Sequence, residues 1–283
     1  MTEPIATTIT ALLDDHAGVL LDAYGVLIDA SGLLPGAASL IAELERRRLP
    51  WLVVTNDASR SAATYAGRFA RLGLAITAHR VMTSGSLLPG YFRTHGLAGA
   101  RTCVLGTEDS LAYVAEGGGV PIALAAGMEL DALAICDDAG FPFLTGMELA
   151  ASAVVRAMAA GRTPALILPN PDLVYPKGGG ELGLTAGAMA LVIEAVVARR
   201  FPARPLKFAH LGKPEPHLFQ TAAERLGLPA SRLVMIGDQL ETDIAGARAA
   251  GLSAALLTGV SRWTDARGVA TVAPTHLLAT IEP

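Results

Sequence analysis

The sequence predicts an α/β fold in which helices wrap both faces of a parallel sheet. Short aliphatic runs alternate with stretches of helical periodicity, as in parallel strands joined by crossover helices. The alternation restarts near residue 98, which indicates a second α/β module. The chain has 283 residues, more than one hydrophobic core usually organises. We therefore expect two domains.

The first half of the chain contains the elements of the first sheet in order. Aliphatic runs predict strands over residues 18–22, 51–56 and 81–84. Helical periodicity predicts helices over residues 36–48, over residues 60–73, where Gly73 ends the helix, and from Gly85 onward.

The middle of the chain repeats this pattern. We expect strands over residues 101–106, 132–136 and 164–170, with helices between them. A stretch rich in Pro and Gly, residues 169–180, indicates a domain edge or a functional loop. A helix near 184–199 follows, and the tail predicts a helix over 216–226, a strand over 232–238, a helix to 250 and a strand over 253–259.

Composition excludes several classes of partner. A net charge of −4 and a pI near 5.9 leave no basic surface of the kind that nucleic acids or anionic membranes require. No apolar run reaches membrane-spanning length. Cys103 and Cys136 are too few for a disulfide framework, and the N-terminus lacks the pattern of a signal peptide. We expect a cytoplasmic protein that binds no nucleic acid and no membrane.

Polar residues end two of the predicted strands of the first half. Asp22 ends an aliphatic run and comes shortly before Gly25, which permits a tight reversal of the chain. Its carboxylate is therefore a candidate nucleophile for phosphorus; the alternative is a turn-forming Asp. Thr55 and Asn56 follow the next run and offer hydrogen-bond donors to a phosphoryl oxygen; the alternative is a helix N-cap. In parallel sheets, ligands bind at these strand ends.

Two further sequence positions carry charged groups: one has a lysine, and the other has a pair of aspartates. Lys213 lies between Gly212 and Pro214, where it can neutralise a phosphate, although most lysines are merely solvated. Asp238 ends a hydrophobic strand, and Asp243 follows five residues later. Paired carboxylates at one strand end suit Mg²⁺; the alternative is a helix start that favours acidic residues.

Asp22, Thr55, Lys213, Asp238 and Asp243, in this order, resemble the motifs of the haloacid dehalogenase superfamily. The resemblance implies a doubly wound, Rossmann-like core. The gap of about 150 residues before Lys213 implies an inserted cap similar to that of class IIA, the branch of the pyridoxal phosphate and nitrophenyl phosphate phosphatases. We predict a core of residues 1–97 and 201–283 and an α/β cap of residues 98–200.

The resemblance also implies roles for the residues of the site. Asp22 would be the nucleophile and a Mg²⁺ ligand, with the main-chain carbonyl of Tyr24 and the carboxylate of Asp238 as further ligands. Asp243 would orient metal-bound water. Thr55 and Asn56 would hold the phosphoryl group, and Lys213 would bridge it to Asp22.

One position departs from the family pattern. Phosphatases of this superfamily usually carry a second Asp two residues after the nucleophile, where this chain has Tyr24. General acid–base catalysis is typically worth about 10²- to 10⁴-fold, so its loss predicts a slow enzyme rather than an inactive one.

We therefore expect a Mg²⁺-dependent phosphatase of small phosphomonoesters that forms an aspartyl-phosphate on Asp22. The alternative is a regulatory protein that binds phosphate esters with weak or lost turnover, because Tyr24 replaces the general acid. Chemistry on a phosphonate or a haloacid stays open as a third hypothesis. A small phosphorylated substrate is expected beneath the cap, and a homodimer is left open.

Overall fold

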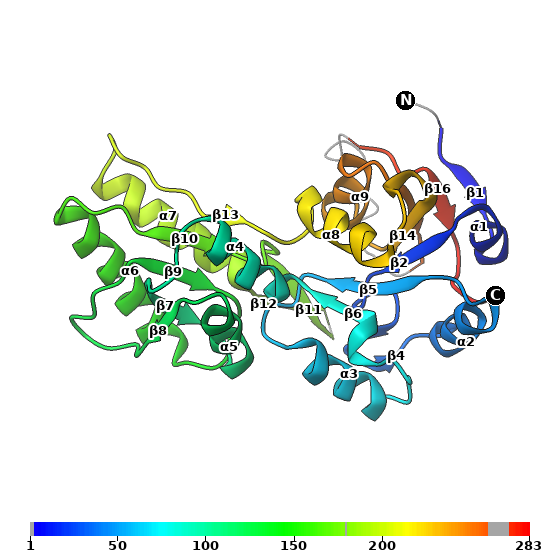
Figure 1. The fold of residues 1–283 in the computed structure, drawn as a ribbon, viewed down its shortest axis with the longest axis horizontal. Helices are drawn as coiled ribbons and strands as arrows, with labels where there is room; N and C mark the ends of the chain where they lie inside the picture. The colour runs from blue at the N-terminus through cyan, green and yellow to red at the C-terminus, as the bar shows by residue number, and fades with distance from the viewer. Residues whose placement is uncertain (1–2, 179, 260–271) are drawn as a thin grey trace. The chain divides into compact units, whose positions relative to one another are not determined.

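The computed structural model describes residues 3–178, 180–259 and 272–283. Residue contacts divide the chain into two compact units, each with its own sheet (Figure 1). The first unit lies within residues 1–55, 62–82 and 213–283, and the second within residues 56–61 and 83–212. The second unit therefore contains the predicted cap range of 98–200 and extends beyond it. The assignment of this unit as a cap stays a prediction.

A seven-stranded sheet forms the centre of the first unit, in the order β1-β16-β15-β14-β2-β5-β6. The neighbouring strands from β1 to β5 all pair in parallel. The strands are β1 (Ile5–Thr7), β2 (Gly18–Leu21), β5 (Trp51–Thr55), β6 (Val81–Thr83), β14 (Leu233–Gly237), β15 (Ser253–Leu257) and β16 (His276–Leu278). A small hairpin of β3 (Ile28–Asp29) and β4 (Gly32–Leu33) follows β2.

Both faces of this sheet are buried. Successive side chains of a strand point to opposite faces: Val19 and Leu21 of β2 join a core cluster with the first three helices, and Leu20 between them is also fully buried. The helices and helical turns of this unit are α1 (Ile9–Asp15), α2 (Ala37–Arg47), α3 (Ala62–Arg71), η1 (Ala78–Arg80), α8 (Pro216–Leu226), η3 (Ala230–Arg232), η4 (Leu240–Ile244) and α9 (Ala245–Ala249). The predicted doubly wound α/β class is confirmed, because burial on both faces requires helices on both.

The second unit is built on a parallel sheet of five strands, in the order β13-β10-β9-β7-β8. The strands are β7 (Arg101–Leu105), β8 (Val120–Ile122), β9 (Ala132–Ile135), β10 (Ala165–Leu168) and β13 (Ala209–His210). The helices are η2 (Ser84–Leu87), α4 (Leu88–Thr94), α5 (Glu108–Glu116), α6 (Phe143–Ala159) and α7 (Ala186–Arg200). Side chains of α6 and α7 pack on β7, β9 and β10 to form its core.

The stretch rich in Pro and Gly is more ordered than we predicted from its composition. Strand β11 (Val174–Gly178) pairs antiparallel with β12 (Glu181–Leu184) as a separate hairpin. Pro176 is compatible with it because a two-stranded ribbon consists only of edge strands, where a missing N–H donor is tolerated.

Three elements near the chain ends escaped prediction. Strands β1 and β16 have three residues each, and they pair with one another at the edge of the sheet. Helix α1 has seven residues. Runs this short carry no measurable periodicity, so only their tertiary partners define them.

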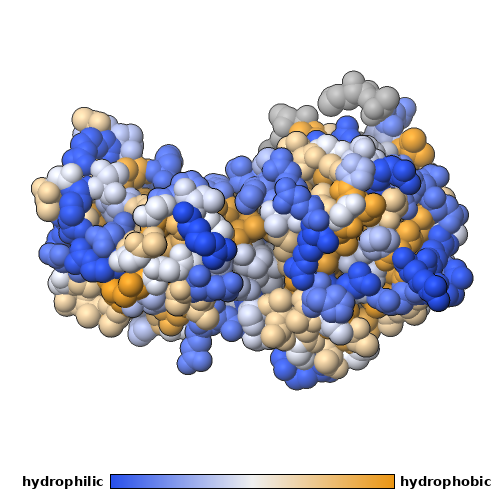
Figure 2. All heavy atoms as spheres, viewed as in Figure 1, coloured by the Kyte–Doolittle hydropathy of each residue, from blue (hydrophilic) through white to orange (hydrophobic). Residues whose placement is uncertain are grey.

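The surface of both units is mixed in character. Figure 2 shows hydrophilic residues spread over the visible face of each unit, with apolar patches between them. Within the described ranges, no helix combines the length and the apolar character that crossing a membrane requires.

Candidate active site

The carboxyl ends of three neighbouring strands carry the polar residues predicted from the sequence. Asp22 directly follows β2, Asp238 follows β14 and Thr55 is the last residue of β5. In the sheet, β5 and β6 lie on one side of β2, and β14, β15 and β16 lie on its other side. The order in which successive strands are added to the sheet therefore changes direction at β2. The point where the strand order reverses is where ligands bind in open α/β sheets.

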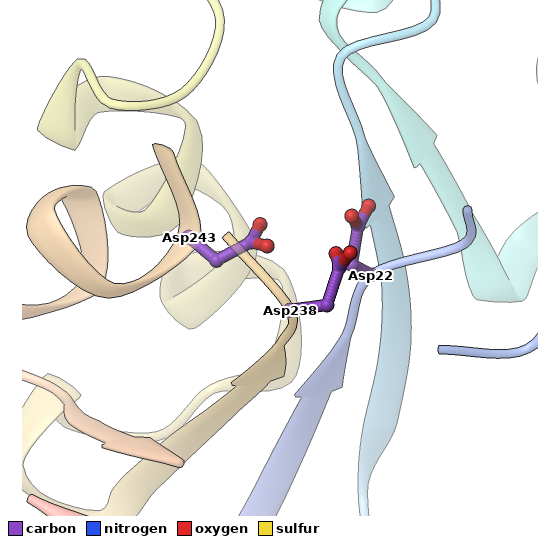
Figure 3. Close-up of side chains that lie close together, drawn as sticks. All are labelled: Asp22, Asp238 and Asp243. Atoms are coloured by element: carbon purple, nitrogen blue, oxygen red, sulfur yellow. The ribbon is translucent and has the colours of Figure 1, made fainter. Parts of the chain in front are cut away.

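Three carboxylates meet at this point. Figure 3 shows Asp243 of η4 directing its carboxylate towards those of Asp22 and Asp238. All three residues are buried, and one oxygen from each lies within 4.8 Å of the others. Oxygen donors at such separations suit a hard divalent cation.

Two glycines permit this close approach. A Cβ atom at Gly25 would lie 2.4 Å from Cγ of Asp238, and the φ of Gly25 is +91°. A Cβ atom at Gly237 would lie 2.3 Å from Cβ of Asp243. A side chain at either position would push an aspartate out of the cluster, and the backbone at Gly25 favours glycine for its positive φ as well.

Lys213 provides the positive charge of the cluster. Its Nζ donates hydrogen bonds to Oδ1 of Asp22 (2.7 Å), to Oδ1 of Asp243 (2.6 Å) and to the carbonyl of Val54 (3.3 Å). The residue is only 2% exposed. Burial would lower the pKa of Lys213, but the Asp22 and Asp243 carboxylates raise it well above its usual value. The ammonium therefore stays charged.

One ammonium does not balance three buried carboxylates. Burial and the neighbouring Asp243 raise the pKa of Asp22 to about 7, although Lys213 acts in the opposite direction. Burial and the other two carboxylates also raise the pKa of Asp238 well above its usual value. Oδ1 of Asp238 is buried and has no hydrogen-bond partner among the described residues. Excess negative charge and an oxygen without a partner both fit a bound cation.

Asp22 is held on one side only. Its Oδ1 accepts hydrogen bonds from the Ala23 N–H (2.8 Å) and from Lys213, and its main-chain N–H donates to the carbonyl of Ile236. Within the described parts of the chain, Oδ2 accepts no hydrogen bond. The geometry thus orients one oxygen and leaves the other available for attack.

Thr55 and Asn56 are both buried at the end of β5. β5 lies beside β2 with Val53 opposite Leu21, so Thr55 reaches the same sheet edge as Asp22. Asn56 belongs to the second unit by its contacts. Its Nδ2 donates to Oδ1 of Asp172 (2.9 Å). The sequence did not predict this hydrogen bond, although Asp172 follows β10 in an Asn-Pro-Asp run.

Tyr24 lies in the tight turn that follows the candidate nucleophile. Its backbone forms a bridge with Ile28, and the Gly25 N–H donates to the Ile28 carbonyl. The side chain is partly buried. The position that usually carries the second Asp of the family pattern is therefore part of the same hydrogen-bonded loop as Asp22.

Two family models match the chain. One, described as haloacid dehalogenase-like hydrolase, matches residues 19–119, and the other, described as HAD-hydrolase-like, matches residues 210–282. Together they cover more than half of the sequence and include Asp22, Thr55, Lys213, Asp238 and Asp243. With the sheet order and the acidic cluster, they define the class of protein. This chain belongs to the haloacid dehalogenase-like hydrolases, in the class IIA branch that includes phosphatases.

Individual relatives agree with this assignment. Chronophin of Mus musculus is 29% identical over 94% of this chain and 89% of its own length. D-glycerol 3-phosphate phosphatase of Mycobacterium tuberculosis is 33% identical over 80% of this chain and 59% of its own length.

Solved structures reproduce the whole fold. A possible sugar phosphatase of the HAD superfamily from Cytophaga hutchinsonii superposes with a TM-score of 0.85 at 29% identity, covering 99% of both chains. Glycerol phosphate phosphatase of Mycobacterium tuberculosis in complex with magnesium superposes with a TM-score of 0.78 at 25% identity, covering 98% of this chain and 77% of that one.

Proposed function

We propose that this protein is a Mg²⁺-dependent phosphatase of small phosphomonoesters that acts through an aspartyl-phosphate on Asp22. The convergence of Asp22, Asp238, Asp243 and Lys213 at one strand edge supports the proposal most directly. The relatives include a glycerol 3-phosphate phosphatase, whose substrate is a small phosphate ester. Because the relatives include phosphatases, we favour catalysis over the purely regulatory alternative.

The proposed metal ligands are Asp22, Asp238 and the main-chain carbonyl of Tyr24, with Asp243 orienting metal-bound water. Asp238 Oδ1, buried without a hydrogen-bond partner among the described residues, supports the assignment, as does the magnesium complex of the mycobacterial relative. When bound, Mg²⁺ would neutralise the charge that develops on the transferring phosphoryl group.

The reaction follows from the chain's own residues. Oδ2 of Asp22 attacks phosphorus, the phosphorus–oxygen bond to the alcohol breaks, and the leaving alkoxide takes up a proton from solvent water. Water then attacks the phosphorus of the aspartyl-phosphate, which releases phosphate and restores the carboxylate. Lys213 balances the added negative charge, and Thr55 with Asn56 positions the phosphoryl oxygens. Positioning and charge neutralisation supply most of the catalysis in phosphoryl transfer.

A screen of small phosphomonoesters tests the proposed function. We expect phosphate release from sugar phosphates, glycerol phosphates or pyridoxal phosphate with Mg²⁺, and none after chelation by EDTA. Asp238→Asn should lose the activity and the stabilisation by Mg²⁺, whereas Asp14→Asn, an exposed acid on α1, should keep both. Failure to hydrolyse any monoester with Mg²⁺ would contradict the proposal.

The effect of Mg²⁺ should depend on pH. The pKa of Asp22 is raised to about 7, so the folded protein holds a proton that the unfolded chain releases near pH 4. The stability gained from this proton is present below about pH 4 and is lost as the pH rises to about 7. Mg²⁺ binds the ionised form. Its effect on the melting temperature should therefore grow from about pH 5.5 to about pH 7.5 and then level off.

Thermal unfolding at each pH, with Mg²⁺ and with EDTA, measures this dependence. Asp22→Asn should flatten the profile because it removes both a proposed Mg²⁺ ligand and one of the carboxyls with a raised pKa. A Mg²⁺ effect that is already complete at about pH 5.5 would argue against the raised pKa.

Tyr24 provides a further test. If the missing carboxylic acid limits turnover, Tyr24→Asp should raise the kcat for alkyl phosphates, within the range of about 10²- to 10⁴-fold typical of general acid–base catalysis. The gain should be smaller for aryl esters, whose leaving groups need less protonation. Tyr24→Asn is the matched control, since it changes size equally and adds no acid. Equal gains in both variants would show that bulk, and not acidity, limits the enzyme.

The remaining expectations stay predictions. They are a cytoplasmic location, a homodimer and a site roofed by the second unit. Chemistry on a phosphonate or a haloacid becomes the leading hypothesis only if phosphomonoesters are not hydrolysed.

A further inference from the structure

Two histidines from opposite ends of the chain meet at the edge of the seven-stranded sheet. His16 directly follows α1, and His276 begins β16, which pairs with β1. Figure 1 shows these first and last elements side by side in the first unit. The two ring centroids are 5.8 Å apart, with the ring planes at 84°. Neither residue belongs to the acidic cluster or has a part in the proposed reaction.

The hydrogen bond of His16 determines which ring nitrogen carries the proton. Nδ1 lies 2.8 Å from the carbonyl oxygen of Leu12. A carbonyl only accepts hydrogen bonds, so Nδ1 must be the donor. In the neutral ring, Nε2 then carries a lone pair.

The contacts of His276 are compatible with the same tautomer. Its Nδ1 lies 2.8 Å from Oγ1 of Thr275. That hydroxyl donates its single proton to the Ala254 carbonyl (2.9 Å) and accepts the Ala254 N–H (2.8 Å). In this arrangement the remaining lone pair of the hydroxyl accepts from Nδ1 of His276, and Nε2 of the neutral ring again keeps a lone pair.

In these tautomers Nδ1 of each imidazole is hydrogen-bonded and Nε2 has a free lone pair, as is usual in metal-binding histidines. Such histidines donate their second ring N–H to a carbonyl or another fixed acceptor, which orients the ring. Two imidazoles that share one Zn²⁺ at the usual bond length would place their centroids about 5 Å apart. The observed 5.8 Å requires only a small adjustment of the rings.

The charges around the pair favour a cation. Burial lowers the pKa of His276, the neighbouring His16 lowers it further, and the Asp15 carboxylate acts in the opposite direction. The neutral ring is the form that binds metal. Asp15 adds a negative charge within electrostatic reach, which favours a divalent ion bound by two neutral imidazoles.

We propose that His16 and His276 form a second metal site, distinct in chemistry from the acidic cluster, which binds Zn²⁺ or a similar transition-metal ion through the two Nε2 atoms. Imidazole nitrogens select such ions, whereas carboxylates select Mg²⁺. The bound ion would join α1 to β16 and so stabilise the sheet edge that the two ends of the chain build. Water would complete the coordination, and Asp15 would act through its charge.

Zn²⁺ titration of the metal-free full-length protein tests this site, with Mg²⁺ at saturating concentration to occupy the acidic cluster. Calorimetry should give one Zn²⁺ per chain, and thermal unfolding should show a higher melting temperature with Zn²⁺. His16→Gln and His276→Gln should each weaken the affinity by about tenfold or more, since even the outer hydrogen-bond partner of a ligating histidine is worth roughly 10- to 100-fold. His79→Gln, an exposed histidine of the same unit, is the matched control and should bind like the wild type.

Two further measurements separate a metal site from a packing contact. Melting temperatures with EDTA show whether the glutamine variants still fold, and their Mg²⁺-dependent activity should equal that of the wild type. Asp15→Asn, which keeps both rings, should weaken Zn²⁺ binding without lowering the metal-free melting temperature. No Zn²⁺ binding by the wild type, or binding that both glutamine variants retain, would overturn the proposal.

Discussion

Asp22→Asn is expected to lower kcat/KM for phosphomonoester hydrolysis by about 10⁴-fold or more, because the amide cannot form the phosphorylated intermediate. Loss of a nucleophile in other enzymes costs up to about 10⁶-fold. The substitution keeps the shape of a side chain whose Oδ1 accepts from Ala23 and Lys213, so the fold should persist. Steady-state kinetics and intact-protein mass spectrometry would follow activity and phosphorylation together.

The control for this variant is Asp29→Asn. Asp29 lies in the hairpin after the same strand, where its carboxylate accepts hydrogen bonds from Ser31 and Gly32, and it is not part of the acidic cluster. It should retain most of the wild-type activity. Substantial turnover by Asp22→Asn, with the substrate phosphate still released, would refute the assignment of the nucleophile.

Lys213→Met is expected to be the most destabilising single change in the site. It removes the ammonium that contacts both Asp22 and Asp243 at 2.6–2.7 Å and leaves the carboxylates buried without compensation. Removing one partner of a buried ion pair typically costs about 3–5 kcal/mol. Urea unfolding in EDTA should show this loss, and added Mg²⁺ should recover part of it by restoring positive charge.

Lys207→Met provides the matched comparison. Lys207 also pairs with a buried carboxylate, that of Glu194, but its own side chain is 76% exposed. Solvent screening makes such a pair worth about 1 kcal/mol or less. Lys213→Met combined with Asp243→Asn should be more stable than Lys213→Met alone, because it removes one of the uncompensated charges. Equal stability of Lys213→Met and the wild type would show that the cluster is not electrostatically coupled as described.

The positions of the strands and of most site residues were predictable because their signals are local. The aliphatic runs before Asp22 and Asp238 define strands by themselves, and a polar residue after such a run must lie at the carboxyl edge of a parallel sheet. Gly237 directly precedes Asp238, and Gly25 lies three residues after Asp22. Their physical role, a close approach that any Cβ would block, became visible only in the structure.

Other features carry no local signal. The Asn56–Asp172 hydrogen bond joins residues 116 positions apart. The hairpin of β11 and β12 forms within a stretch whose Pro and Gly content favours a loop. The His16–His276 pair depends on β1 and β16, strands too short to predict. Each of these contacts depends on which segments become neighbours, and chain periodicity does not report that.

The sequence by itself determined the α/β class, the strand ends that carry Asp22, Thr55 and Asp238, and the family to which the chain belongs. The resemblance implied that Lys213 lies near Asp22, but only the tertiary structure showed that its ammonium contacts Asp22 directly across 191 residues and also bonds Asp243. Strand order is the physical reason: β14 pairs with β2 although most of the chain lies between them. Burial at that junction then sets the charge balance of the site, which no local pattern encodes.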